Sequence, residues 1–139
     1  MKKKILVTRK LLMENEEKLK ELFDVKLNSK DELYNSDKII ELSKDCDGIL
    51  SAITDQFNKD LIEKLSPSIK IIANFAVGFG NIDVNAAAKK NITVTNTPKV
   101  LDDSTADISI LLLLGASRKV LEARRAAELQ NWKWSADFM

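Results

Sequence analysis

The chain has 139 residues and a mass of 15.6 kDa, a size typical of one domain with its own hydrophobic core. Its 22 basic and 21 acidic side chains argue against a nucleic-acid partner, and its lack of histidine excludes a histidine-based proton transfer from this chain. With Cys46 as the only cysteine, we expect no disulfide and no metal site. Its apolar runs fall short of the ~20 residues that cross a bilayer, and no signal peptide is evident, so we expect a cytoplasmic protein without membrane attachment.

The chain predicts an alternation of strands and helices as far as Pro98. Short apolar or alternating runs predict strands at 4–8, 24–28, 48–53, 69–76 and 91–96. Helical patterns fill the gaps at 13–23, 37–43, 58–65 and 84–90, and we expect Ser36 to cap the second of these helices.

Such repeating units, each of about 20 to 25 residues, are typical of a doubly wound parallel sheet with helices on both faces. We predict an α/β fold over residues 1–98, with a flavodoxin-like sheet of five strands in the order 2-1-3-4-5. Ligands of these sheets bind beyond the carboxyl ends of the strands, so residues 51–54 and 76–80 are the candidate site.

A loop with two glycines follows the fourth predicted strand, at Val77, Gly78, Phe79 and Gly80. Two glycines spaced by one residue can take positive φ and direct successive backbone N–H groups at one point. This loop is therefore a candidate anion site.

The residues alone leave two readings of this loop open. Gly78 to Asp83 approximates the G-x-G-x-x-G motif that holds a pyrophosphate, although Asp83 stands in place of the third glycine. The other reading is a tight turn that Asp83 caps, without a ligand. Asp55, after the third strand, is placed like the phosphate-accepting aspartate of response-regulator receivers, but Arg9 and Lys10 occupy positions where receivers need acidic residues.

The pattern changes in residues 99–139. Ser104 to Asp107 resembles a capping box, and the absence of a helix-breaking cluster before Asn131 predicts one helix of roughly thirty residues. Its first half, 108–116, is apolar all round, which is typical of a helix buried on every side. We expect Trp132 and Trp134 to pack against a neighbouring domain or subunit.

From Asn74 to Trp134 the chain resembles the D-isomer-specific 2-hydroxyacid dehydrogenases, most closely their glyoxylate and hydroxypyruvate reductases. The resemblance extends to the GILSAITD run of the third strand and covers nearly the whole chain. The matching features are Val77-Gly78, Asn81-Ile82-Asp83, Asn96-Thr97-Pro98, Thr105-Ala106-Asp107, the apolar helix and the final Trp-Lys-Trp.

The resemblance implies a two-domain oxidoreductase that uses NAD or NADP. Residues 1–98 would form the substrate-binding domain, and residues 99–139 a long helix that reaches the cofactor domain and contributes to a homodimer. The backbone around Ala76, Val77 and Gly78 would hold the carboxylate of a small 2-oxoacid, bordered by Ser51 and Ala52. Val77 and Thr105 would lie near the nicotinamide.

The sequence also departs from the family pattern. The family's G-x-G-x-x-G domain, its catalytic arginine, glutamate and histidine, and its returning C-terminal helix would all lie after Met139. Gly80 replaces an aspartate or asparagine often found there. We therefore expect no catalytic residue in this chain and no activity from the chain alone. The alternatives are a stand-alone binding or dimerisation module and a complete mononucleotide-binding domain that uses Gly78 to Gly80.

Overall fold

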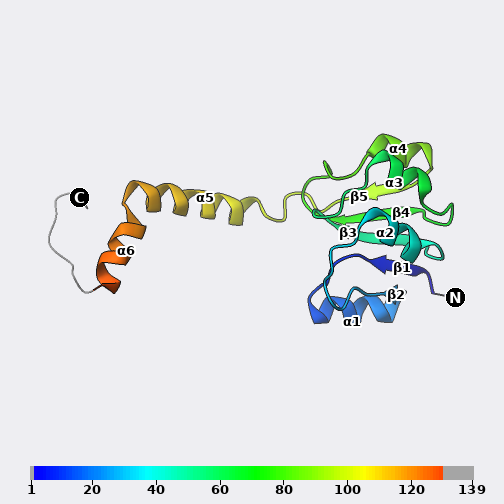
Figure 1. Cartoon of the computed structure of the whole chain (residues 1–139), viewed down its shortest axis with the longest axis horizontal. Helices are drawn as coiled ribbons and strands as arrows, with labels where there is room; N and C mark the ends of the chain where they lie inside the picture. The colour runs from blue at the N-terminus through cyan, green and yellow to red at the C-terminus, as the bar shows by residue number, and fades with distance from the viewer. Residues whose placement is uncertain (1, 130–139) are drawn as a thin grey trace. The chain divides into compact units, whose positions relative to one another are not determined.

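Five parallel strands form a sheet in the order β2-β1-β3-β4-β5 (Figure 1). The structure is a computed structural model that describes residues 2–129. The order and the parallel pairing confirm the predicted fold. The strands are β1 (Lys4–Val7), β2 (Asp24–Lys26), β3 (Gly48–Ala52), β4 (Ile71–Phe75) and β5 (Thr93–Thr95).

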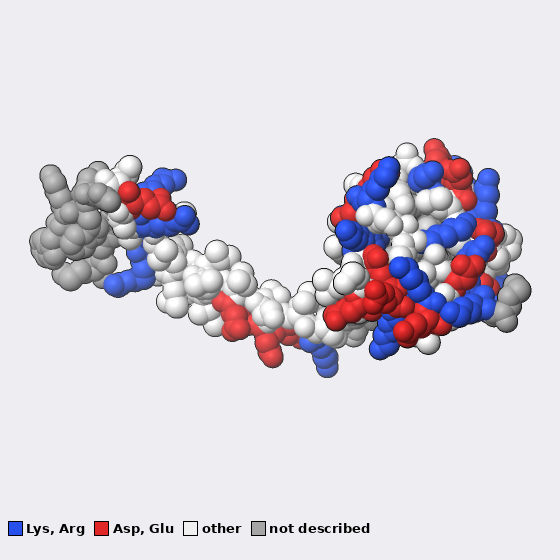
Figure 2. Space-filling model, turned by 90° about the horizontal axis from the view of Figure 1, so that it is seen from below, with Lys and Arg blue, Asp and Glu red and all other residues white. Residues whose placement is uncertain are grey.

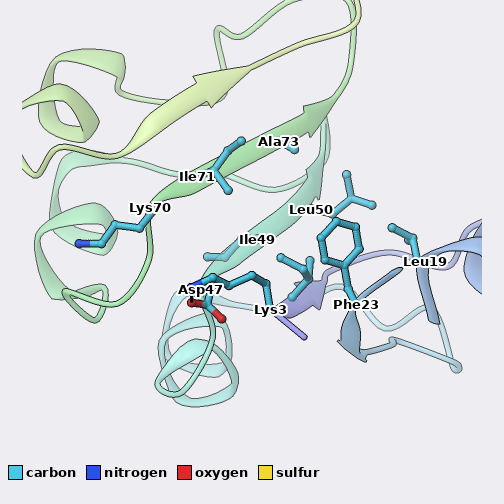
Figure 3. A pocket seen from close by; sticks show the side chains of 10 residues that line it. Lys3, Leu19, Phe23, Asp47, Ile49, Leu50, Lys70, Ile71 and Ala73 are labelled. Atoms are coloured by element: carbon cyan, nitrogen blue, oxygen red, sulfur yellow. Dashed lines mark hydrogen bonds and ion pairs between the residues drawn. The ribbon is translucent and has the colours of Figure 1, made fainter. Parts of the chain in front are cut away.

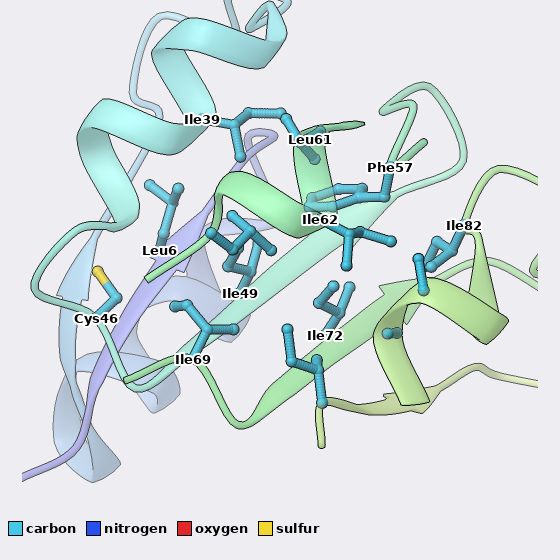
Figure 4. Close-up of a cluster of buried hydrophobic side chains, with 14 residues drawn as sticks. Leu6, Ile39, Cys46, Ile49, Phe57, Leu61, Ile62, Ile69, Ile72 and Ile82 are labelled. Atoms are coloured by element: carbon cyan, nitrogen blue, oxygen red, sulfur yellow. The ribbon is translucent and has the colours of Figure 1, made fainter. Parts of the chain in front are cut away.

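Three helices cover one face of this sheet and enclose the hydrophobic core. Alternate strand residues Leu6, Ile49 and Ile72 are at most 1% exposed, because strand side chains point to opposite faces in turn. Figure 4 shows these residues beneath Ile39 and Ile62, which come from the covering helices. The covering helices are α2 (Ser36–Ser43), α3 (Lys59–Lys64) and α4 (Val84–Lys89).

The opposite face is covered by α1 (Met13–Leu22). Leu19 of this helix and Phe23 just after it border a groove together with Ile5, Leu50 and other sheet residues. None of the residues of α1 is fully buried. This face of the sheet is therefore less completely covered than the face that holds the core.

Asparagine and aspartate side chains begin three of these helices. The Asn35 side chain accepts a hydrogen bond from Lys38 N, so α2 is capped one residue earlier than the predicted Ser36. The Asn58 side chain caps α3, and Asp83 Oδ1 accepts from Ala86 N at 2.9 Å at the start of α4. The turn after the glycine loop is thus closed by Asp83, as the second reading of the sequence required.

Among the described residues, those from Lys99 onward belong to a second compact unit. Its helices are α5 (Asp102–Ser117) and α6 (Val120–Glu128), so the prediction of one continuous helix is wrong. Lys119 takes the left-handed backbone conformation with φ 50°, which ends the first helix before the second begins. The predicted capping box is also wrong, since α5 starts at Asp102 and no side chain caps it. Trp132 and Trp134 lie outside the described residues.

The surface of α5 is apolar and exposed. Its charges are confined to Asp102, Asp103 and Asp107, and Figure 2 shows the remainder of the helix as largely uncharged. No residue of α5 is buried within this chain, and Leu113 is 69% exposed, so the described chain does not itself supply the burial on every side that the sequence predicts. Among the described residues, no helix is both long enough and apolar enough to cross a membrane.

Candidate functional site

The predicted loop lies at the carboxyl end of β4, beside the end of β3. The register of the two strands pairs Ser51 with Asn74 and Ala52 with Phe75, so both strands end at the same edge of the sheet. Residues 76–80 leave this edge directly after Phe75. Five of the predicted site residues are therefore brought together here, namely Ser51, Ala52, Ala76, Val77 and Gly78.

Three successive carbonyl groups of the loop are held by hydrogen bonds. Ala76 O accepts from Thr97 N at 2.9 Å, and Val77 O accepts from Asn96 Nδ2 at 2.7 Å. Gly78 O accepts from Asn74 Nδ2 at 3.0 Å. The donors come from β4 and from the segment after β5, so neighbouring strands fix the path of the loop.

The N–H groups of the same peptide units are left free. A trans peptide points its C=O and its N–H in opposite directions, and residues 2–129 contain no cis peptide. The N–H groups of Val77, Gly78 and Phe79 therefore point away from the three donors. No described residue accepts a hydrogen bond from them, whereas Ala76 N donates to Asn74 O at 2.8 Å.

The glycines of the loop border open space. Neither Gly78 nor Gly80 has positive φ, so that part of the prediction is wrong. A Cβ atom added at either position would meet no atom within 4 Å. Val77 is 36% exposed and Phe79 is 52% exposed. The loop that carries the free N–H groups thus has exposed side chains and open space beside its glycines.

A buried polar cluster supports the loop from within the fold. Asn74 is 2% exposed, and its Oδ1 accepts from Ser51 Oγ at 3.1 Å. Asn74 Nδ2 also donates to Asn81 Oδ1 at 3.0 Å. Asn81 Nδ2 in turn donates to the carbonyl oxygens of Asp55, at 2.9 Å, and Ala52, at 3.2 Å. These bonds tie the loop to the segment after β3.

Asp55 lies at the end of this cluster and is 1% exposed. Its Oδ2 accepts from Thr8 Oγ1 at 2.5 Å and from Ala52 N at 2.9 Å. Its Oδ1 has no hydrogen-bond partner among the described residues. A carboxylate so enclosed is inaccessible to a phosphate donor, which agrees with the exclusion of a receiver-type phosphorylation site.

Arg9 is the cation that follows β1 at this edge, and it is already paired. Its Nε and Nη2 donate to the two carboxylate oxygens of Asp31 at 2.8 and 3.0 Å, and its Nη1 donates to Thr54 Oγ1 at 2.7 Å. The hydrogen bond from Arg9, assisted by one from Lys10 N, holds the pKa of Asp31 well below its usual range. Arg9 therefore carries a charge that Asp31 neutralises.

Thr105 belongs to α5 in the second unit, unlike the other predicted site residues. Its backbone N–H donates to Leu101 O at 2.9 Å, and its carbonyl oxygen accepts from Ser109 Oγ at 2.7 Å. Its side chain is exposed.

Two apolar grooves lie on the sheet face beside α1. Figure 3 shows the first, of about 400 Å³, which Leu19 and Phe23 line on one side and Leu50 and Ile71 of the sheet line on the other. The second, of about 650 Å³, reaches from Leu12 and Leu22 to Phe75. Neither is lined by a residue of the 76–80 loop. Their predominantly aliphatic and aromatic walls suit packing against another apolar surface better than binding of a small anion.

Sequence reasoning placed the loop but missed the residues that hold it. Asn74 interrupts an otherwise apolar strand, and a polar side chain at such a position usually satisfies its hydrogen bonds inside the fold. That signal alone could have marked it. The sequence marks Asn96 and Asn81 only as parts of motifs, because the carbonyl oxygens that they bind belong to residues 19, 26 and 29 positions away in the chain.

Known proteins match this chain over almost its full length. The family model described as D-isomer specific 2-hydroxyacid dehydrogenase, catalytic domain, matches residues 5–134. The glyoxylate reductase of Korarchaeum cryptofilum is 43% identical over 134 residues, which are 96% of this chain and 40% of that protein. The chain thus spans about two fifths of the length of that relative.

Solved structures agree. The NADPH-dependent glyoxylate/hydroxypyruvate reductase of Sinorhizobium meliloti, in complex with NADP and malonate, is 32% identical with a TM-score of 0.78. That match covers 95% of this chain and 40% of the other. A glyoxylate reductase from Paecilomyes thermophila is 27% identical with a TM-score of 0.77, and the match covers 94% of this chain and 43% of the other. From the sheet order and the match over residues 5–134, we conclude that the chain belongs to the D-isomer specific 2-hydroxyacid dehydrogenases, a family of oxidoreductases.

Proposed function

We propose that this chain is the substrate-binding portion of an NAD- or NADP-dependent oxidoreductase. The reaction is the reduction of glyoxylate or hydroxypyruvate to the corresponding D-2-hydroxy acid. Family membership and the activities named for the similar proteins support this proposal. A reducing, cytoplasmic compartment is part of it and is supported by Cys46, which is buried and free.

One observation carries the proposal: the N–H groups of Val77, Gly78 and Phe79 have no acceptor among the described residues, and Gly78 borders open space at the carboxyl edge of the sheet. Hydrogen bonds from N–H groups to a carboxylate are charge-assisted and stronger than those to a neutral acceptor. A 2-oxoacid offers a carboxylate of the right size for two adjacent donors. Val77 and Gly78 then hold the carboxylate, and the end of β3 at Ala52 borders the rest of the molecule. The Ala76 and Ser51 groups support the loop through their hydrogen bonds.

The same loop does not suit the pyrophosphate of a dinucleotide. The carboxylate of Asp83 occupies the start of α4, where a pyrophosphate would need free N–H donors and no negative charge. In this proposal the cofactor is bound mainly by other parts of a longer protein, since this chain matches about 40% of the length of its relatives. Only the nicotinamide end approaches this chain, near Val77 and Thr105.

Titration of the ¹⁵N-labelled chain with oxalate, a small analogue of a 2-oxoacid, tests the anion site by NMR. We expect saturable shifts centred on the amide signals of Val77, Gly78 and Phe79, because those N–H groups have no other acceptor. Sodium chloride at equal ionic strength should leave these signals in place. Shifts spread over surface lysines, or none at all, contradict the proposal. A response to adenosine diphosphate centred on Gly78 to Asp83 supports the mononucleotide alternative instead.

We also propose that α5 forms a homodimer contact, since its leucines are exposed over consecutive positions. A glutamate at Leu112 would place a charge in an apolar contact, and we expect it to raise the dimer dissociation constant by at least about tenfold. Leu33 is the matched control, because both side chains are 66% exposed and Leu33 lies in the first unit. Sedimentation equilibrium of wild-type, Leu112→Glu and Leu33→Glu chains measures the effect. A monomeric wild type, or equal weakening by both substitutions, contradicts the contact.

The same exposed helix is what favours the alternative of a stand-alone binding or dimerisation module. The intact mass of the native product in its source cell distinguishes this module from a portion of a longer enzyme. A stable species of 15.6 kDa supports the module, and a substantially larger one supports the substrate-binding portion of a longer enzyme.

A further inference from the structure

We infer that Asn96 and Asn74 are positioning residues: by binding the carbonyl oxygens of Val77 and Gly78, they set the direction of the N–H groups that receive the anion. Neither side chain needs to touch the substrate. The geometry is the pair of hydrogen bonds at 2.7 and 3.0 Å described above. The inference rests on the proposed function for the identity of the anion, and on the fold alone for the orientation of the loop.

Of the three peptide units whose N–H groups are free, the one between Val77 and Gly78 could most easily turn over. Reversing a peptide changes ψ of the residue before it and φ of the residue after it, and only glycine accepts either sign of φ at little cost. Residue 78 is glycine, and a Cβ atom added to it would meet no atom within 4 Å. Local backbone preferences therefore do not decide which way this N–H points. The hydrogen bond from Asn96 Nδ2 to Val77 O does.

Asn74 is a rigid support because its own bonding is complete. Its Oδ1 accepts from Ser51 and Asn81, and its Nδ2 donates to Gly78 O and Asn81 Oδ1. A buried amide with every group satisfied has one favoured orientation, since any other leaves polar atoms without partners. The peptide between Gly78 and Phe79 is thereby fixed from beneath. Substitution of Asn74 would disturb the whole buried cluster.

Asn96 offers the cleaner test. It is half-buried, and its side chain makes a single hydrogen bond among the described residues, so its removal should spare the core. The neighbouring bond from Thr97 N to Ala76 O is between backbone atoms and remains in any variant. Replacement of Asn96 by alanine therefore removes one donor from one carbonyl. The reversed orientation of the 77–78 peptide then becomes populated, and binding weakens in proportion to the fraction of chains that lose the receptive form.

The experiment compares wild-type, Asn96→Ala and Asn85→Ala chains, all ¹⁵N-labelled and of full length. Asn85 is an exposed residue of α4 for which no hydrogen bond of the side chain is found in the described structure. Two quantities are measured in each chain. The first is the NOE between Val77 Hα and the Gly78 amide proton without anion, which reports ψ of Val77. The second is the dissociation constant for oxalate. Thermal unfolding midpoints check that the fold is retained.

We expect Asn96→Ala to change this NOE and to raise the oxalate dissociation constant about tenfold, as loss of one hydrogen bond allows. Asn85→Ala should leave both unchanged. An unchanged NOE in Asn96→Ala overturns the inference, even if affinity falls, and so does an unchanged affinity. If wild type itself shows no oxalate response at 77–79, the proposed function fails. In that case, a changed NOE in Asn96→Ala would show only that Asn96 orients the loop. The inference that Asn96 contributes to anion binding would be overturned as well.

Discussion

The 139-residue chain, mixed with glyoxylate and either NADH or NADPH, is expected to oxidise neither cofactor above the rate of a blank without protein. Hydride transfer to a carbonyl needs a cofactor held against the substrate and a group that protonates the forming alkoxide. Correct positioning is worth effective molarities of about 10⁵ M or more, and a general acid about 10²- to 10⁴-fold. The chain contains no histidine to act as that acid, and its glycine loop is unsuited to a pyrophosphate. The decrease in absorbance at 340 nm measures the rate.

A chimera distinguishes a chain that is inactive because the rest of the enzyme is missing from a chain that does not bind the substrate at all. This chain would replace the matching 40% of the Korarchaeum cryptofilum glyoxylate reductase, to which it is 43% identical. We expect the chimera to reduce glyoxylate, and the intact relative serves as the positive control. Turnover by the isolated chain contradicts the first prediction. A chimera that folds but shows no turnover contradicts the assignment of residues 1–98 to substrate binding.

Phe57→Ala is expected to destabilise the first unit by about 3–5 kcal/mol, the range for removing a fully buried aromatic side chain. Phe57 is 0% exposed and lies in the core cluster. Its backbone also links the segment after β3 to the segment after the glycine loop, donating to Asn81 O and accepting from Asp83 N, each at 2.8 Å. A domain whose total stability is about 5–15 kcal/mol loses a large part of it. The denaturant midpoint and slope of unfolding measure the change.

Phe79→Ala is the matched control for this substitution. It removes the same atoms from a side chain that is 52% exposed and lies in the loop, so we expect a change within about 0.5 kcal/mol. Similar losses for the two variants would show that burial of Phe57 is not what stabilises the fold.

Much of the fold could be predicted because its signals are local. Each strand is a short apolar or alternating run, and three of the four helices of the first unit begin after an asparagine or aspartate, so the βα alternation indicates a parallel sheet directly. The prediction errs at the ends of the helices. Asn35 and Ser36 are both good capping residues, and only the extended backbone of Asn35 shows which one begins α2.

The division of the second unit has no comparable signal. Arg118 and Lys119 are neither glycine nor proline, and a left-handed backbone at such residues costs about 1–2 kcal/mol. Sequence patterns favour a continuous helix there. The apolar run 108–116 predicts a buried helix, and the structure shows that the chain itself leaves α5 exposed; a partner for this surface stays a prediction.

The location of the candidate site was predictable, and the way it is built was not. Ligand sites of parallel sheets lie at the carboxyl ends of strands, which directs attention to Ala52 and Gly78. The sequence predicts positive φ at the glycines because glycine adopts either sign of φ easily, but neither loop glycine has it. Instead, the side-chain amides of Asn74 and Asn96 bind the carbonyl groups of the loop. Hydrogen bonds between residues far apart in the chain, such as that from Thr8 to Asp55 over 47 positions and that from Asn96 to Val77 over 19, depend on the completed sheet.

The dependence of the loop on Asn96 has a consequence for the order of folding. Asn96 follows β5, a strand of three residues at the edge of the sheet, and comes 19 residues after Val77. During synthesis the loop therefore leaves the ribosome before the amide that orients it. The core can assemble around β1, β3 and β4 while the N–H groups still lack a fixed direction. Docking of β5 completes the receptive form, and fraying of this edge strand removes it while the core stays folded.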